Sequence, residues 1–249
     1  MTPTTFRRLL AAVLIAGLLG GCGDNRGEEQ VLADASKKIE NLSYRSAIIE
    51  LRNLLRNNPK SLPARVALAG ALLEVGDFDA ADKELSRAVD LGATPDQTYS
   101  LRAKIFAGRG EFALLLAEIN PDAVESPALA SELRAMRGRA MLGFNSKDEA
   151  ISTFEGVLAE GQSTEAQRIA LLGLATVAEG KADFAEAERL ARQSLEIAPD
   201  SAESMLRVGQ LLIVQTRFDD AIAFLSDDNI QNVRVSRLEK FRLYGERAQ

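Results

Sequence analysis

The side chains that most often perform catalysis or bind metal ions are scarce in this sequence. Its 249 residues contain no histidine and a single cysteine, Cys22. Without histidine, the histidine-dependent sites of serine and cysteine hydrolases cannot form, and the commonest zinc ligand is missing. One cysteine cannot make an internal disulfide or a thiolate metal cluster. The sequence therefore names no catalytic residue, metal ligand or cofactor, and predicts a protein that is not an enzyme.

Neighbouring carboxylates are the remaining candidates for acid–base chemistry. The pairs Glu28/Glu29 and Asp219/Asp220 each lie at the expected start of a helix, where a negative charge complements the helix dipole. We therefore interpret them as structural. Glycine-rich phosphate-binding loops of the P-loop or dinucleotide type are absent from the sequence.

Composition and charge narrow the class of protein further. Hydrophobic residues make up 46% of the chain, aromatic residues only 5%, and there is no tryptophan. A core rich in alanine and leucine favours packed helices over a β-sandwich. The net charge of −6 and the pI of about 5.0 argue against a nucleic-acid partner. An acidic protein gains no binding free energy from releasing the counterions of a phosphate backbone.

The one cysteine lies where an apolar N-terminal run ends. Arg7 and Arg8 precede the apolar residues 9–19, a run shorter than the ~20 residues that span a bilayer. The sequence Leu19-Gly20-Gly21-Cys22 resembles the lipobox of bacterial lipoproteins, in which the cysteine is acylated and becomes the new N-terminus. We expect residues 1–21 to be a lipoprotein signal peptide and residues 22–28 to be the lipidated cysteine with a short tether. The alternative is an ordinary secretory signal that contains a cysteine.

The lipobox resemblance also carries an expectation about location. Acyl chains on Cys22, palmitate among them, would anchor the protein to a bacterial membrane on its periplasmic side. Gly23 follows the cysteine in place of the aspartate that retains lipoproteins in the inner membrane of Gram-negative bacteria. Outer-membrane sorting is therefore favoured over inner-membrane retention.

Beyond residue 28, aromatic side chains recur at a fixed step along the chain. Tyr44, Phe78 and Phe112 are separated by 34 residues, as are Phe184 and Phe218. Most of these aromatic residues are followed three positions later by an alanine. This pattern resembles the tetratricopeptide repeat, a helix-turn-helix unit of about 34 residues. We expect residues 29–249 to form an all-α, right-handed α-solenoid of about six such units.

One unit shows the physical basis of the repeat most clearly. Ala69 and Ala81 are small enough to let the two helix axes approach closely, and Phe78 can fill the gap between helices. Gly76 can adopt a positive φ at the turn. Asp77 can cap the second helix.

Several departures from the repeat predict local differences. Asn120-Pro121 should cut short the second helix of the third unit, and Pro127 should allow a new helix to start near residues 126–129. Lys147 replaces the turn aromatic in the fourth unit. The basic residues 234–249 should form a helix that either caps the solenoid or begins a seventh unit of a longer parent.

Four segments resemble one particular lipoprotein family, and this resemblance is closer than their resemblance to the general repeat. They follow the lipobox in the order 46–55, 76–85, 110–119 and 133–140. This order is similar to the N-terminal part of the tetratricopeptide lipoproteins encoded with the PEP-CTERM/exosortase and exopolysaccharide system. The resemblance implies an envelope accessory factor, either a short relative or the N-terminal piece of a longer member. The pilotin-like lipoproteins of type IV pilus assembly share the size and plan, but their detailed motifs match less well.

In the tetratricopeptide fold, the first helix of each unit lines a concave groove. We expect partner-facing positions in the second to sixth units at Val66, Leu73, Lys104, Arg139, Leu142, Leu172, Leu206, Gln210 and Ile213. Lys104 and Arg139 would receive an acidic group of the partner; the alternative is that both are solvated surface charges. The asparagine and paired cations that grip chaperone C-termini in one subclass are missing.

These observations predict a membrane-anchored scaffold that binds other envelope proteins through its groove, as an accessory to exopolysaccharide or PEP-CTERM protein export. A pilotin-like role in pilus or secretin assembly is the second hypothesis. A polysaccharide-binding accessory protein or an enzyme is the third, and the absence of tryptophan argues against an aromatic platform for sugars.

Overall fold

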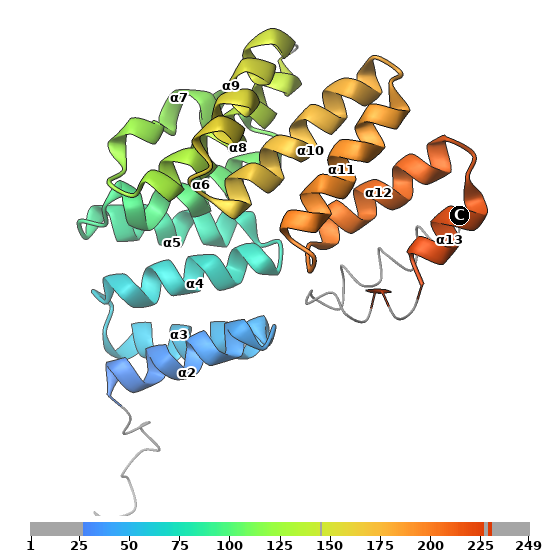
Figure 1. The fold of residues 1–249 in the computed structure, drawn as a ribbon. Coiled ribbons are helices and arrows are strands. Elements are labelled where there is room, and N and C mark those ends of the chain that lie inside the picture. Colours follow the sequence, from blue (N-terminus) through green and yellow to red (C-terminus); the bar gives the residue numbers. More distant parts are fainter. Residues whose placement is uncertain (1–26, 145, 227–228, 231–249) are drawn as a thin grey trace, which may run out of the picture.

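The computed structural model describes residues 27–144, 146–226 and 229–230. The expected signal peptide, Cys22 and the C-terminal segment 234–249 lie outside these residues. Within the described part, all regular structure is helical, with twelve α-helices and one 3-10 turn (Figure 1). None of the described helices is both long and apolar enough to cross a membrane.

The helices follow one another as six antiparallel pairs. In order, the pairs are α2 (Glu28–Glu40) with α3 (Tyr44–Asn57), α4 (Leu62–Glu74) with α5 (Phe78–Asp90), α6 (Pro95–Arg109) with α7 (Phe112–Glu118), α8 (Pro127–Gly143) with α9 (Lys147–Glu160), α10 (Thr164–Gly180) with α11 (Phe184–Ile197), and α12 (Ala202–Val214) with α13 (Phe218–Phe224). The 3-10 turn η1 (Pro121–Ala123) separates α7 from α8.

The pairs stack into a curved array rather than around one centre. Each helix packs on its neighbours in sequence, and the first helices of adjacent units also touch: α2 with α4, α4 with α6, α6 with α8, α8 with α10 and α10 with α12. Figure 1 shows the stack bending from the blue units at one end to the red units at the other. The prediction of an all-α solenoid of about six units is confirmed.

The turn between α4 and α5 has the chemistry that the repeat pattern predicts. Gly76 adopts a φ of +78°, and the Asp77 side chain accepts a hydrogen bond from the backbone N–H of Ala80 at 3.2 Å. This cap explains why α5 begins at Phe78. In the sixth unit Thr216 takes the equivalent left-handed conformation, with a φ of +60°, although a β-branched residue adopts it at a cost.

Small and large side chains alternate across the interfaces between helices. Ala69 and Ala81 are fully buried, as expected for positions of close helix approach. The Phe78 ring packs against Gly108 on the first helix of the next unit, where a methyl group would lie 2.5 Å from the ring. The aromatic residue of the repeat therefore couples one unit to the following one.

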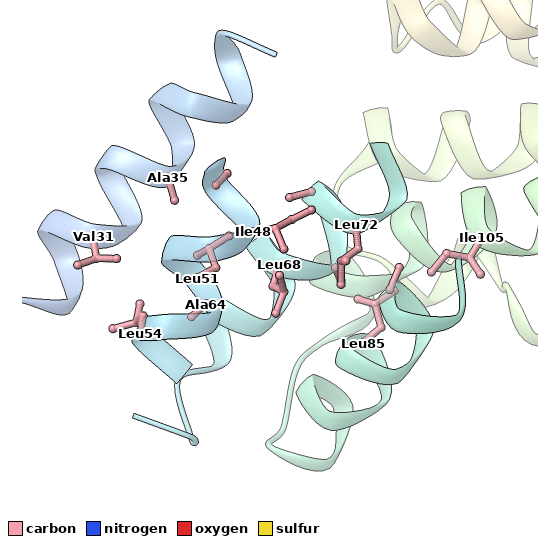
Figure 2. Close-up of a cluster of buried hydrophobic side chains, with 14 residues drawn as sticks. Val31, Ala35, Ile48, Leu51, Leu54, Ala64, Leu68, Leu72, Leu85 and Ile105 are labelled. Carbon is pink, nitrogen blue, oxygen red and sulfur yellow. The ribbon is translucent and has the colours of Figure 1, made fainter. Parts of the chain in front are cut away.

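The N-terminal core illustrates how the units share their apolar side chains. Figure 2 shows Val31 and Leu51 of the first unit, Leu68 and Leu85 of the second, and Ile105 of the third in one cluster. Because each cluster spans adjacent units, burial of apolar surface stabilises the array pair by pair.

The predicted interruption of the third unit is confirmed. Helix α7 ends at Glu118, and the Asn120 side chain then accepts a hydrogen bond from the N–H of Asp122 at 3.1 Å. Ser126 caps α8 through the N–H of Leu129 at 3.3 Å, and Pro127 occupies the first helical position.

Candidate functional site

A groove of about 690 Å³ follows the first helices of four consecutive units, α6, α8, α10 and α12. Its walls include the apolar side chains of Phe112, Met136 and Ile169 together with several charged residues. Since one side of each first helix faces this groove, a partner lying along it would contact four repeats at once.

The structure brings most of the predicted positions together in this groove. Those that line it are Lys104, Arg139, Leu142, Leu172, Leu206 and Gln210. The remaining three lie elsewhere. Val66 and Leu73 are partly buried on α4, before the groove begins, and Leu73 packs against the N-terminal core. Ile213 lies almost one turn beyond Gln210 and packs against the core of the last two units.

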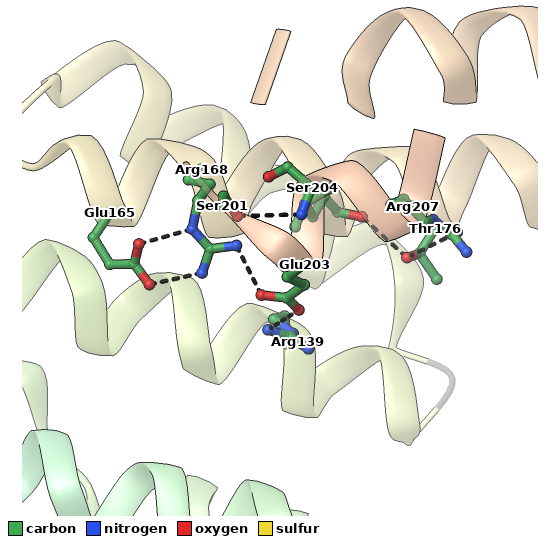
Figure 3. A network of polar contacts seen from close by, with 9 residues as sticks. Arg139, Glu165, Arg168, Thr176, Ser201, Glu203, Ser204 and Arg207 are labelled. Atoms are coloured by element: carbon green, nitrogen blue, oxygen red, sulfur yellow. Dashed lines mark hydrogen bonds and ion pairs between the residues drawn. The ribbon is translucent and has the colours of Figure 1, made fainter. Parts of the chain in front are cut away.

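Charged side chains form a network across the groove that links three units (Figure 3). The Arg168 guanidinium on α10 donates to both carboxylate oxygens of Glu165 at 2.7 Å and to Glu203 on α12 at 2.7 Å. The other oxygen of Glu203 lies 3.0 Å from the guanidinium of Arg139 on α8. Glu203, which belongs to the sixth unit, therefore connects the fourth and fifth units to it through its two carboxylate oxygens.

The network favours the charged forms of Glu203 and Arg168. Burial disfavours the charged form of Glu203, but the positive charges of Arg139 and Arg168 outweigh it and lower the pKa of Glu203. Burial likewise opposes the charge on Arg168, whose side chain is 10% exposed, but the hydrogen bond with Glu165 and the charge of Glu203 raise its pKa. Glu203 and Arg168 are therefore both charged at neutral pH.

This arrangement changes the role expected for the two predicted cations. Arg139 already has a carboxylate partner in Glu203, so an acidic group of a partner protein would have to share it. Lys104 is exposed and makes no ion pair with any described residue. The groove therefore offers its most available positive charge at Lys104.

A second cation of the groove is incompletely satisfied. Arg207 on α12 donates to Glu179 at 2.5 Å and, at 3.4 Å, to the hydroxyl of Thr176. Its Nε is buried, and no acceptor in the described part of the chain reaches it. A buried donor without an acceptor is costly, so the placement of Arg207 in the groove carries a local energetic penalty.

Sequence reasoning missed the acidic members of the network, although a signal was present. Glu165 and Glu203 are each the second residue of a first helix, and Arg168 follows Glu165 by three positions. Comparing the same position in successive units would have singled out the two carboxylates, but not the arginines that they contact. In the described part of the chain, no group of three acidic, histidine or cysteine residues is placed to hold a metal ion.

Comparison with known proteins agrees with the architecture. Models of the tetratricopeptide repeat match residues 39–105, 135–201 and 172–227, together more than half of the chain. No curated protein matches the chain.

Three solved structures show the extent of the similarity. A chain of the APC/C Cut9-Hcn1 hetero-tetramer has a TM-score of 0.62 at 14% identity, over 88% of this chain and 42% of that one. The pilF protein of Pseudomonas aeruginosa has a TM-score of 0.53 at 17% identity, over 88% of this chain and 96% of that one. The type IV pilus biogenesis factor PilW has a TM-score of 0.54 at 14% identity, over 88% of this chain and 100% of that one.

At these identities the likeness concerns the fold alone, and the chain spans less than half the length of the Cut9-Hcn1 chain that it matches. The repeat matches, the six helix pairs and the groove along the first helices agree with one another, and the chain belongs to the tetratricopeptide-repeat proteins.

Proposed function

We propose that this protein is a membrane-anchored scaffold of the bacterial cell envelope that captures another envelope protein in the groove of α6, α8, α10 and α12. The observation that carries the proposal is the groove itself, which combines an apolar lining with cations that are free or incompletely satisfied. The tetratricopeptide fold is typically a non-catalytic scaffold for protein–protein interaction, which agrees with this role.

The chemistry of the groove indicates the kind of segment that it would bind. A helix or extended segment would place apolar side chains against Leu142, Leu172 and Leu206. An acidic side chain of the same segment would reach Lys104, or Arg139 if it shares that guanidinium with Glu203. Such a partner is recognised by its pattern of apolar and acidic residues.

The anchor in this proposal is an acylated Cys22, supported by the lipobox resemblance. Helix α2 begins at Glu28, so only a few residues would separate the folded array from the membrane. The proposed pathway, export of exopolysaccharide or of PEP-CTERM surface proteins, is supported by the family resemblance of the repeat segments.

A pilotin-like role in type IV pilus or secretin assembly is the second candidate. It is supported by size and plan, because this chain covers almost the whole length of pilF and PilW, one of which is described as a pilus biogenesis factor. A polysaccharide-binding accessory role or an enzymatic activity is the third candidate, and no side-chain arrangement described above supports it.

The first test is capture of partners from membranes. The full chain with its own signal and the Cys22→Ala variant are expressed, crosslinked, purified and analysed by mass spectrometry. We expect the wild type to be acylated and membrane-bound, with partners from the polysaccharide or exosortase machinery. Pilus or secretin subunits would support the second candidate instead. A soluble, unacylated wild type would contradict the anchor.

The groove is tested separately with neutral substitutions. Reversing the charge of Arg139 would place a second carboxylate beside Glu203, so Lys104→Gln with Arg139→Gln is the cleaner variant. We expect capture of the crosslinked partner to fall about tenfold, since charged contacts to a partner typically carry this much. A control with the same charge change, Lys181→Gln with Arg189→Gln on exposed positions, should retain capture. Equal capture by the groove variant and the wild type would contradict the proposed site.

A further inference from the structure

A second concave surface, the basic cleft, lies on the first two units and outside the groove. It encloses about 360 Å³ between α3 and α5, with Leu68 and Leu72 of α4 at its floor. Its charged lining comprises five cations and one carboxylate: Arg52, Arg56, Arg65, Lys83, Arg87 and Glu84. Such a concentration of positive charge is unexpected in a chain whose net charge is −6.

The single carboxylate cannot neutralise the cleft. Glu84 pairs with Arg65 at 2.5 Å and with Arg87 at 2.6 Å, so it shares one negative charge between two cations. Arg56 donates to the neutral side chain of Asn53 at 2.5 Å. Arg52 and Lys83 are exposed, and neither forms an ion pair with a described residue. Several positive charges of the cleft are therefore available to a ligand.

The cleft lies beside the point where the chain leaves toward Cys22. The carboxylate of Glu28, the first residue of α2, accepts hydrogen bonds from Asn58 at 2.5 Å and from Ser61, both in the turn between α3 and α4. In the same turn, the carbonyl oxygen of Pro59 accepts a hydrogen bond from Nε of Arg65 at 3.1 Å. The start of the folded array and the basic cleft thus share one turn.

The short tether limits how far the cleft can lie from an anchored Cys22. A fully extended chain advances by about 3.3–3.6 Å per residue, so the residues between Cys22 and Gly27 reach at most about 20 Å. If Cys22 is acylated, the cleft is held close to the head groups of the bilayer. This reach is an upper limit, so the cleft can also approach the surface to within the Debye length of about 8 Å, where its charges are only partly screened.

We propose that the basic cleft binds the phosphate groups of anionic phospholipids in the membrane that holds Cys22, an inference that rests on the proposed anchor. Arginine matches phosphate with two parallel hydrogen bonds, and clustered Arg and Lys residues near a membrane are drawn to anionic lipid. Binding at α3 and α5 orients the first two units toward the bilayer. The partner groove, which begins at α6, then remains accessible.

The test uses the chain from residue 23 onward, which keeps every described residue and has no acylation site. Its binding is measured by co-sedimentation with vesicles of phosphatidylcholine alone and with vesicles that also contain phosphatidylglycerol. We expect wild-type protein to bind the anionic vesicles at least tenfold more strongly, and added salt to weaken the binding. Arg52→Gln with Lys83→Gln should lower binding about tenfold or more, because each basic residue near an anionic surface contributes severalfold.

The matched control is Lys147→Gln with Lys181→Gln, which removes two exposed cations from the fourth and fifth units. We expect it to bind like the wild type, with unchanged helical circular dichroism in both variants. No preference of the wild type for anionic vesicles would overturn the proposal. Equal loss in the control would overturn it too, because the attraction would then come from diffuse charge. Since this chain lacks Cys22, vesicle binding is measured independently of acylation, which is measured on the full chain. Failure of the basic cleft and failure of the anchor can therefore be distinguished.

Discussion

At the scale of single residues, pairs of glycine and phenylalanine determine how closely neighbouring units pack. Phe154 is fully buried between Gly138 and Gly173, on the first helices of the fourth and fifth units. A methyl group would lie 2.6 Å from the ring at Gly138 and 2.2 Å at Gly173. The fourth unit has Lys147 at its turn, and Phe154, about two turns further along α9, supplies the missing aromatic contact.

Gly173→Ala tests this packing. Alanine is the better helix former by about 1 kcal/mol, but overpacking a fixed core costs about 1–3 kcal/mol. Because the Phe154 ring has no exposed side toward which to move, we expect the cost to exceed the gain and the variant to be less stable by up to about 2 kcal/mol. The midpoint of urea denaturation measures the change.

The control is Gly156→Ala in α9, where a methyl group would meet no atom within 4 Å. Helix propensity alone should then make this variant more stable, by up to about 1 kcal/mol. If both variants shifted stability in the same direction, the steric role of the glycine at 173 would be excluded.

At the scale of elements, the short helix α7 is held in place by a side chain of the helix that follows it, α8. Helix α7 has seven residues, too few to be stable by itself. The Arg137 guanidinium on α8 donates to the carbonyl oxygens of Leu116 at 2.6 Å and Ile119 at 2.7 Å. It thereby satisfies acceptors that the early end of α7 leaves without helical partners.

Arg137→Met should release this end of α7. Two charge-assisted hydrogen bonds to backbone carbonyls are lost, and we expect a decrease in stability of about 1–3 kcal/mol. Amide hydrogen exchange should be faster in α7 than in the wild type, while the amides of α10 remain protected.

Arg134→Met on the same helix provides the comparison. Arg134 is 37% exposed and pairs with Glu160 at 3.0 Å and Asp122 at 3.4 Å. A surface ion pair contributes about 0–1 kcal/mol, so this variant should change α7 exchange little. Similar exchange in both variants would argue that Arg137 has no special role.

At the scale of the whole molecule, stability is distributed along the array. The described apolar core divides into separate clusters, the largest at the two ends: one around Leu51 and Leu68, the other around Leu172 and Leu211. In such a solenoid each unit interacts with its neighbours only, so a local defect destabilises its own region first.

Leu51→Ala is expected to test this directly. Leu51 is fully buried in α3, and its truncation should cost about 2–5 kcal/mol. Hydrogen exchange measured by mass spectrometry should show loss of protection in α2–α5, with α10–α12 close to wild type. Leu211→Ala, also fully buried, should give the opposite pattern. A uniform loss of protection from either change would show one cooperative unit instead.

The sequence by itself determined the repeating architecture. The 34-residue step of aromatic residues, the Gly76-Asp77 turn and Asn120-Pro121 predicted where helices pair and where one is cut short. These features act within a few residues of chain, because caps, positive φ angles and proline restrict the local backbone. Most of the groove positions could be predicted too, since the repeat tells which helix of each unit lines the concave side.

Only the tertiary structure decided which charges meet. Glu203 lies between Arg139 and Arg168, from different units, and the basic cleft gathers cations from α3, α4 and α5. The repeat period gives the distance along the chain from one unit to the next. It does not give the small rotation between units, and this rotation determines which side chains of separate helices come within hydrogen-bonding distance.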